Sequence, residues 1–309
     1  MGKIAFVFPG QGAQAVGMGR DAYESNAEAR DIYERADAAL GFPISKLSFE
    51  GPEEELRQTA NTQPALLATS VALLEAYRSQ GVKPDYVAGH SLGEYSALVA
   101  AGVLAFEDAI RLVRARGQFM EQAVPSGQGA MAAVLGAERD ALAALCADIT
   151  AGAGVVELAN VNCPGQIVVS GSAEGVAEVV ARGKEAGAKR VIPLEVSGPF
   201  HSSLMRPAAD KLSAELVKVA FGDASVPVVA NVHAKPVTSG DELRGLLVEQ
   251  VVSPVQWEDT IKFLIAEGVD TFVEIGSGTV LAGLIKKVDK SVQVVSVNTA
   301  AAAAGAIAQ

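Results

Sequence analysis

Cysteine is nearly missing from this sequence, which carries only Cys146 and Cys163. Two cysteines cannot build a disulfide framework or a cysteine metal site, so we expect a reducing, cytoplasmic environment. Long hydrophobic runs are missing as well, because the longest, residues 96–106, is interrupted by Gly102 and is too short to span a bilayer. The opening Met1-Gly2-Lys3 leads straight into a strand-like run, so no secretory signal is expected.

Positive charge is also scarce. The 309 residues contain 25 Lys and Arg against 36 Asp and Glu, which gives a formal net charge of −11. Nucleic acid or an anionic membrane would be repelled over most of such a surface, so neither is expected as a partner. Aromatic residues make up only 5% of the chain while 50% of it is hydrophobic, so the core must be built from Ala, Val, Leu and Ile.

The length allows one large domain or two of unequal size. Short apolar runs alternate with helical patterns in both outer parts of the chain, and this alternation predicts a parallel sheet covered on both faces. Strands are expected at residues 3–8, 85–89, 226–229, 271–275 and 292–297. Helices are expected after Ser91 and at 20–40, 63–80 (Pro64 in its first turn), 106–123, 203–219, 241–252 and 257–267. The Ala-rich tail at 299–309 is expected to fray.

The middle of the chain follows a different order. Strands are predicted at 131–135, 155–159, 166–170 and 190–194, with helices at 137–148 and 173–186. The order βαββαβ is that of a ferredoxin-like unit. We therefore predict an α/β protein whose large domain is formed by residues 1–127 and 197–309, with a small ferredoxin-like domain inserted at 128–196.

Residues 89–93 read Gly-His-Ser-Leu-Gly and match the G-x-S-x-G nucleophile elbow. A predicted strand precedes the motif and a helix follows it, so Ser91 would lie on a sharp turn at the carboxyl end of a strand. The glycines let the backbone bend, and the N-terminus of the helix directs free N–H groups toward an oxyanion formed there. The alternative is that this five-residue pattern occurs by chance, but the strand–turn–helix context favours a catalytic serine.

A catalytic serine needs a base, and the chain has only three histidines. His90 adjoins Ser91, and neighbours at a strand end point to opposite sides, so it is poorly placed to take the proton. His233 follows a predicted strand and fits an exposed loop. His201 lies in a loop after the small domain, where side chains reach clefts between domains. His201 is therefore the favoured base, with a solvent-facing helix-cap histidine as the alternative.

No carboxylate is suitably placed in the sequence to be the third member of a catalytic triad. The aspartates between Ser91 and His201 all fall on predicted helices rather than on a turn after a strand; they are Asp108, Asp140 and Asp148. The Ser-Asp-His order of α/β-hydrolases therefore lacks its acid, and another kind of group must orient the histidine.

Arg116 stands out on the predicted helix at 106–123. At about 100° per residue this helix has one polar stripe, and Arg116 lies roughly opposite it, on the side of Leu112 and Phe119. The stripe consists of Glu107, Arg111, Arg114, Gln118 and Glu121. A guanidinium turned toward the core requires an anionic partner. A free carboxylate on a substrate would supply one bidentately, and a protein carboxylate is the alternative.

A competing motif occurs at residues 10–15, where Gly-Gln-Gly-Ala-Gln-Ala fits the loose dinucleotide-binding pattern after a strand. The acidic residues about twenty positions further on, Asp31 and Asp37, lie in helical sequence where a second strand should end. The fingerprint therefore fails. Cys163 is interpreted as a packed turn residue rather than as a nucleophile.

Several separated segments form one ordered set with the elbow. They are Phe8-Pro9-Gly10-Gln11-Gly12, Thr62-Gln63-Pro64-Ala65, residues 89–95, Arg116-Gly117, Asn160, residues 199–202 and residues 274–278. Together they resemble the malonyl-CoA:acyl carrier protein transacylases of fatty acid synthesis, over almost the whole chain. The fold of that family is an α/β-hydrolase-like core with a ferredoxin-like insertion, which agrees with the order of elements above.

The resemblance implies catalytic roles for five residues. Ser91 would attack the thioester, and His201 would act as the base. The backbone N–H groups of Gln11 and Leu92 would form the oxyanion hole. Gln250 matches the position whose main-chain carbonyl orients the histidine, which would account for the missing acid.

Substrate-binding positions are implied as well. Arg116 would hold the substrate carboxylate, and the other expected positions are Gln63, His90, Met120, Asn160 and Phe200. In related polyketide acyltransferases, Phe at the place of Phe200 goes with selection of malonyl over methylmalonyl groups.

The sequence thus predicts a ping-pong transfer of malonyl from malonyl-CoA to the thiol of holo acyl carrier protein, without a metal or redox cofactor, by a cytoplasmic monomer. A serine hydrolase and a non-catalytic protein that binds acyl carrier protein are the alternatives. Because acyl carrier proteins are usually acidic, docking on a chain of net charge −11 would need a local basic patch. The candidates are Lys189-Arg190 and Lys286-Lys287-Lys290.

Overall fold

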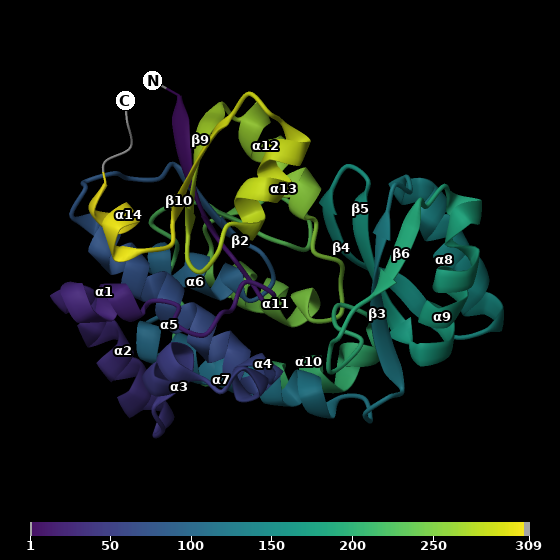
Figure 1. Ribbon diagram of the computed structural model, residues 1–309, viewed down its shortest axis with the longest axis horizontal. Coiled ribbons are helices and arrows are strands. Elements are labelled where there is room, and N and C mark those ends of the chain that lie inside the picture. Colours follow the sequence, from purple (N-terminus) through teal and green to yellow (C-terminus); the bar gives the residue numbers. More distant parts are fainter. Residues whose placement is uncertain (1, 306–309) are drawn as a thin grey trace.

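The computed structural model describes residues 2–305, which fold around two β-sheets (Figure 1). The larger sheet has the strand order β10-β9-β1-β2-β7-β8. Its strands are β1 (Lys3–Phe8), β2 (Tyr86–Gly89), β7 (Val228–Val229), β8 (Pro236–Val237), β9 (Val269–Ile275) and β10 (Gln293–Val297). All neighbours pair in parallel except β7 and β8, which are antiparallel. The protein therefore has an α/β fold with a mixed, mostly parallel sheet.

Helices cover both faces of this sheet, as the sequence predicts. On β1, Phe6 and Phe8 belong to one apolar cluster, whereas Ala5 and Val7 belong to another. The helices of the first cluster are α1 (Arg20–Ser25), α2 (Ala27–Leu40), α3 (Ile44–Glu50), α4 (Glu53–Arg57), α5 (Thr59–Arg78), α6 (Gly93–Ala100), α7 (Phe106–Gln122), α10 (Arg206–Leu216), α11 (Gly240–Gln250) and α14 (Ala300–Ala304). Those of the second are α12 (Trp257–Ala266) and α13 (Val280–Val288).

The second sheet is antiparallel and has the strand order β4-β5-β3-β6. It is formed by β3 (Gly129–Leu135), β4 (Val156–Cys163), β5 (Gln166–Ser172) and β6 (Arg190–Pro193). Its outer face packs against α8 (Arg139–Gly152), α9 (Ala173–Arg182) and the short 3₁₀ helix Gly183–Ala186. Its other face contributes Met131 and Val168 to the large core. The predicted element order βαββαβ is therefore present.

The small sheet is fixed against the larger one by polar contacts as well as by packing. Backbone hydrogen bonds join β4 to the segment before α12, from Val161 N to Val255 O and from Val255 N to Ala159 O. Arg139, at the start of α8, makes a two-point ion pair with Asp259 of α12 at 2.7 and 2.9 Å. Residues on the facing surfaces of the two sheets are thus held at a fixed separation.

Two predicted helix boundaries in the N-terminal part are wrong. The helix expected at 20–40 is divided at Asn26, whose extended backbone ends α1 and whose side chain caps α2 by accepting from Ala29 N. The helix expected from residue 63 begins at Thr59, so Pro64 lies inside α5 rather than in its first turn. Pro64 offers no N–H to the carbonyl of Ala60, and that carbonyl accepts a 2.7 Å bond from Arg114 instead. Helices α3 and α4 were not predicted.

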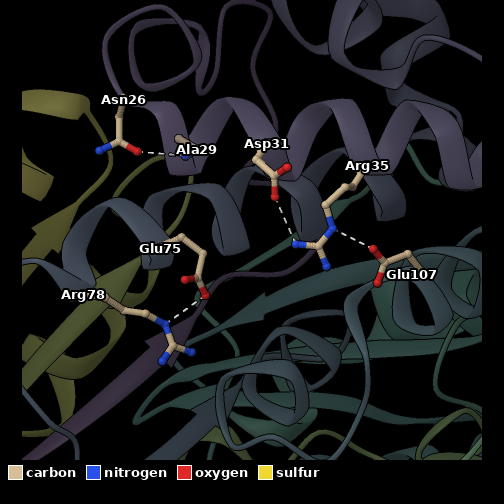
Figure 2. A network of polar contacts seen from close by, with 7 residues as sticks. All are labelled: Asn26, Ala29, Asp31, Arg35, Glu75, Arg78 and Glu107. Carbon is tan, nitrogen blue, oxygen red and sulfur yellow. Dashed lines mark hydrogen bonds and ion pairs between the residues drawn. The ribbon is translucent and has the colours of Figure 1, made fainter.

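An exposed ion network crosses the outer surface of this helical layer (Figure 2). Arg35 of α2 donates to Asp31 on its own helix and to Glu107 of α7, and Arg78 pairs with Glu75 on α5. Solvent-exposed pairs of this kind contribute about 1 kcal/mol or less each. The helical layer is stabilised mainly by the packing of α5, because most residues of this helix are buried against the neighbouring elements.

The C-terminal tail differs from the expected fraying over part of its length. Residues 300–304 form α14, whose first turn is capped by Thr299 and whose Ala303 is buried. Residues 306–309 of the same prediction lie outside the described part of the chain. Within residues 2–305, no helix combines the length and apolar character needed to cross a membrane.

Candidate active site

Ser91 lies on a strained turn between β2 and α6. Its φ angle is +51°, in the left-handed region that few residues other than glycine adopt. The flanking glycines are required by close backbone contacts: a Cβ on Gly89 would lie 1.9 Å from the Gly93 carbonyl, and one on Gly93 would lie 2.1 Å from Phe8 O. The turn therefore has the geometry that the elbow motif predicts.

His201 lies against Ser91 and belongs to the loop that follows β6. The Ser91 Oγ to His201 Nε2 distance is 2.7 Å, and His201 Nδ1 lies 2.9 Å from the backbone oxygen of Gln250. A carbonyl only accepts, so Nδ1 carries the proton and Nε2 is left to accept from the Ser91 hydroxyl. His201 is buried, which excludes the solvent-facing alternative. The structure thus brings the two predicted partners into hydrogen-bond distance and gives the histidine a carbonyl in place of an acid.

Burial also sets the protonation state of His201. Loss of solvation, together with the nearby positive charge of Arg116, lowers its pKa to about 3. The imidazole is therefore neutral at physiological pH and able to accept a proton.

We predict that Ser91 keeps its reactivity at mildly acidic pH. For an imidazole with the ordinary pKa near 6.5, the fraction in the base form would fall about tenfold between pH 7.5 and 5.5. The depressed pKa of His201 should prevent this loss, so the rate of Ser91 modification by phenylmethylsulfonyl fluoride should stay nearly constant over that range. The rate is measured by intact-protein mass spectrometry. A tenfold decline with a midpoint near pH 6.5 would contradict the depressed pKa.

Arg116 points into the same site and is buried. It donates to Gln63 Oε1 at 2.8 Å, to Gln250 Oε1 at 2.9 Å and to Ser91 Oγ at 3.1 Å. These acceptors are all neutral, and Nε has no partner within residues 2–305. Arg116 also makes no ion pair in that part of the chain, so the internal salt bridge considered above does not form there. The predicted core-facing placement is correct, and a buried guanidinium next to Ser91 is available to an anion.

The side chain of Gln250 takes part in the site, whereas the sequence interpretation used only its backbone carbonyl. Its Nε2 donates to Ser91 O at 3.0 Å and to Glu94 Oε2 at 2.7 Å. Asn231 reinforces the elbow from another direction, since its Oδ1 accepts from Ser91 N at 2.8 Å and its Nδ2 donates to Gly89 O at 2.6 Å. Neither Asn231 nor Glu94 was predicted. An asparagine two positions after the predicted strand at 226–229 is the signal in the sequence that could have pointed to Asn231.

A cavity of about 470 Å³ opens between the two sheets at Ser91. Most of the predicted site residues line it: Gln11, His90, Leu92, Arg116, Met120, Asn160, Phe200 and His201. Further lining residues that were not predicted include Met131, Asn162, Gln166, Val168, Val280 and Leu284. Gln63 is buried behind Arg116, outside the lining, so it supports the guanidinium rather than contacting the cavity.

Of the other two histidines, His90 lies where the sequence suggests, whereas His233 is half-buried rather than exposed. His90 Nε2 is paired with Asn162 Oδ1 at 2.8 Å and its ring packs on Trp257, so it shapes the cavity without reaching Ser91 Oγ. His233 lies outside the cavity lining, and its Nδ1 accepts from Lys235 N. Cys163 is buried and burial raises its pKa, as expected of a packed residue, but it is the last residue of β4 rather than part of the turn. Within residues 2–305 no group of three or more metal-ligating His, Cys, Asp or Glu residues occurs.

Comparison with known proteins agrees with this geometry. The sequence matches the acyl transferase domain family over residues 5–305. It is 54% identical over 298 residues to the malonyl CoA-acyl carrier protein transacylase of Bacillus subtilis (strain 168), covering 96% of this chain and 94% of that protein. An acyl carrier protein S-malonyltransferase from Vibrio cholerae superposes with a TM-score of 0.94 at 46% identity, covering 97% of this chain and 98% of the other.

A malonyl-transacylase solved in complex with its type II polyketide synthase acyl carrier protein is similar as well. Its TM-score is 0.94 at 43% identity, with 98% of both chains covered. The chain is thus an enzyme of the acyl transferase class. Within that class it belongs to the malonyl-CoA:acyl carrier protein transacylase family, which confirms the resemblance inferred from its motifs.

Proposed function

We propose that this protein transfers a malonyl group from coenzyme A to the phosphopantetheine thiol of holo acyl carrier protein through an acyl-enzyme on Ser91. One observation carries the proposal. The Arg116 guanidinium lies 3.1 Å from Ser91 Oγ, in a cavity and without an ion-pair partner in the described chain. An acyl group that carries its own carboxylate would supply the missing charge at the place where acyl transfer begins.

The first half-reaction forms the acyl-enzyme. His201 Nε2 takes the Ser91 proton while Oγ forms a bond to the thioester carbonyl carbon. The negative charge of the tetrahedral intermediate is stabilised by the backbone N–H groups of Gln11 and Leu92, both at the cavity beside Ser91. The carbon–sulfur bond then breaks, and the imidazolium gives its proton to the departing coenzyme A thiolate.

The second half-reaction runs the same chemistry in reverse. His201 takes the proton of the carrier protein thiol, the thiolate attacks the malonyl ester, and Ser91 recovers its proton as the carbon–oxygen bond breaks. The Gln250 carbonyl keeps His201 in one tautomer during both halves. Met120, Phe200 and Asn160 surround the acyl group, and the bulk of Phe200 would crowd an α-methyl substituent. No step requires a metal or a redox cofactor.

A serine hydrolase would use the same pair of residues, with water in place of the second thiol. Intact-protein mass spectrometry after addition of malonyl-CoA distinguishes these reactions. We expect one malonyl mass on the protein, which disappears and reappears on holo acyl carrier protein when the carrier is added. Loss of the mass without carrier would indicate hydrolysis, and failure to gain the mass would indicate that the protein only binds.

For the carrier protein we propose docking at the lysines of α13. Lys287 Nζ donates to Gln166 Oε1 at 3.1 Å, and Gln166 lines the cavity. Lys286, in contrast, is engaged by the backbone carbonyls of Lys290 and Val292. Lys287 thus lies at the edge of the site, where an acidic partner could be attracted.

Lys287→Glu should therefore raise the KM for holo acyl carrier protein and leave the kinetics with malonyl-CoA unchanged. Lys46→Glu on α3 provides a control with the same change of charge at an exposed position outside the cavity lining. Steady-state kinetics with each substrate varied in turn make the comparison. Equal effects of Lys287→Glu on both substrates would count against docking there, and would leave Lys189-Arg190 as the remaining candidate.

For the fold, we propose that residues 128–196 form a ferredoxin-like domain inserted into an α/β-hydrolase-like domain of residues 1–127 and 197–309. The support is that the two sheets share no strand and that β3 begins at Gly129 and β6 ends at Pro193. We further propose that the protein is cytoplasmic. We also propose that it acts as a monomer, since one chain supplies every residue of the mechanism above.

A further inference from the structure

Glu94 is a buried acidic residue to which the mechanism above gives no role. It lies in the first turn of α6, behind the nucleophile, and is only 1% exposed. Its Oε2 accepts from Gln250 Nε2 at 2.7 Å and from Asn231 N at 3.4 Å. Gln250 Oε1, on the other side of the same amide, accepts from Arg116 at 2.9 Å. A single amide group therefore separates the carboxylate from the guanidinium.

The chemistry of the two neighbours fixes the orientation of this amide. An ionised carboxylate only accepts hydrogen bonds and a guanidinium only donates them, so Nε2 must face Glu94 and Oε1 must face Arg116. A direct Arg116–Glu94 ion pair would instead occupy the guanidinium in the resting protein. A substrate carboxylate would then have to displace a protein carboxylate of the same charge before it could bind.

We propose that Glu94 is the resident counter-ion of Arg116, placed one amide away so that the guanidinium is charge-compensated yet remains free for the substrate carboxylate. Glu94 is thus a positioning residue that acts through Gln250. This inference rests on the proposed function, because it assumes that Arg116 receives the carboxylate of the malonyl group. It predicts that Glu94 and the substrate carboxylate compensate the same buried charge.

The test uses Glu94→Gln, which keeps an oxygen to accept from Gln250 and removes the charge. Without Glu94 the carboxylate of a ligand becomes the main counter-charge of Arg116, so it should bind more tightly, on the order of 3- to 10-fold. The probe is malonamate, whose single carboxylate is separated from a carbonyl by one methylene group, as in a malonyl thioester. Its Kd is obtained from the thermal stabilisation of each protein at pH 8.5, with acetamide as the probe without a carboxylate.

Glu274→Gln is the matched control. Glu274 is also buried, but its two oxygens accept from the backbone N–H groups of Leu281 and Ala282 at 2.9 and 2.8 Å, at the start of α13. Replacing it removes a buried carboxylate of the same kind away from Arg116. This variant should lose thermal stability and bind malonamate with the affinity of the unmodified protein.

The unmodified protein supplies a second measurement that does not depend on a variant. Burial raises the pKa of Glu94 to about 7. Three ionisable groups around it keep one state between pH 5.5 and 8.5, since Arg116 stays charged, burial raises the pKa of Tyr95, and burial lowers the pKa of His201 to about 3. Burial also lowers the pKa of His90, a group that the unmodified protein and Glu94→Gln share. Protonation of Glu94 should therefore strengthen malonamate binding as the pH falls, whereas the affinity of Glu94→Gln should stay level.

Two results would overturn the role of Glu94 alone. The first is malonamate binding to Glu94→Gln that is equal to or weaker than binding to the unmodified protein. The second is a malonamate affinity of the unmodified protein that falls between pH 8.5 and 5.5 while that of Glu94→Gln stays level. Failure of the proposed function is recognised separately. In that case the unmodified protein would gain no malonyl mass from malonyl-CoA and would bind malonamate no better than acetamide, as would Glu94→Gln.

Discussion

Ser91→Ala should abolish the malonyl-enzyme while leaving the fold intact. The hydroxyl is the group that His201 contacts at 2.7 Å and Arg116 at 3.1 Å, and the other two residues between β2 and α6, His90 and Leu92, carry no hydroxyl. Loss of a nucleophile that works as a unit with its base costs on the order of 10³- to 10⁶-fold in rate. The measurement is the mass of the intact protein after incubation with malonyl-CoA, together with the rate of malonyl transfer to the carrier protein.

Ser96→Ala is a suitable control for this variant. Ser96 lies on α6 a little further along, is buried, and its hydroxyl has no hydrogen-bond partner within residues 2–305. Its removal should leave both the acyl-enzyme and the rate unchanged. A Ser91→Ala protein that still gained one malonyl mass would show that another residue is the nucleophile.

The elbow and Arg116 could be predicted because their signals are local. The turn at Ser91 is predicted by five consecutive residues, in which two glycines flank the serine between a strand and a helix. The helical period alone places Arg116 on the core side of α7, and its burial at 1% exposure agrees. The alternating apolar pattern likewise predicted a covered sheet of mostly parallel strands and the βαββαβ order of the second sheet, but not the antiparallel strand β8.

The polar network behind the elbow could not be predicted, because its members are distant in sequence. Gln250 and Glu94 are 156 positions apart, and Asn231 contacts Ser91 across 140 positions. Whether the side chain of an Asn or Gln lies in the site or faces solvent depends on which helices pack together. The hydrophobic periodicity of the sequence does not predict that packing. The resemblance supplied the Gln250 carbonyl, but the contacts of its side chain became visible only in the structure.

The misplaced start of α5 has a similar cause. Proline usually marks the first turn of a helix because it lacks an N–H, which makes residue 63 the natural beginning. Here Arg114 of α7 bonds to the carbonyl that Pro64 leaves free, so the helix can begin at Thr59. A tertiary contact therefore overrides the local rule, and the same contact joins α5 to the helix that carries Arg116.

Arg116→Ala should change which acyl group the protein prefers. In the resting protein Arg116 donates only to neutral acceptors, so its buried charge gains a full partner when a malonyl carboxylate enters the cavity. An acetyl group would place a methyl group opposite that charge, and transfer of acetyl is therefore disfavoured. A desolvated bidentate pair contributes roughly 2–4 kcal/mol, which corresponds to about 30- to 1,000-fold in relative kcat/KM.

The expected result is a large fall in malonyl transfer by Arg116→Ala, with acetyl transfer unchanged or improved. Arg116→Lys should restore only part of the preference, because an ammonium cannot reproduce the two parallel hydrogen bonds of a guanidinium. Arg114→Ala is the matched control: it removes an arginine from the same helix, but one that bonds to the backbone of Ala60 rather than facing the cavity. The quantity compared is kcat/KM for malonyl-CoA and acetyl-CoA in all four proteins. A malonyl-to-acetyl ratio that survives in Arg116→Ala would make the arginine structural, and the carboxylate of the substrate would have to be recognised elsewhere in the cavity.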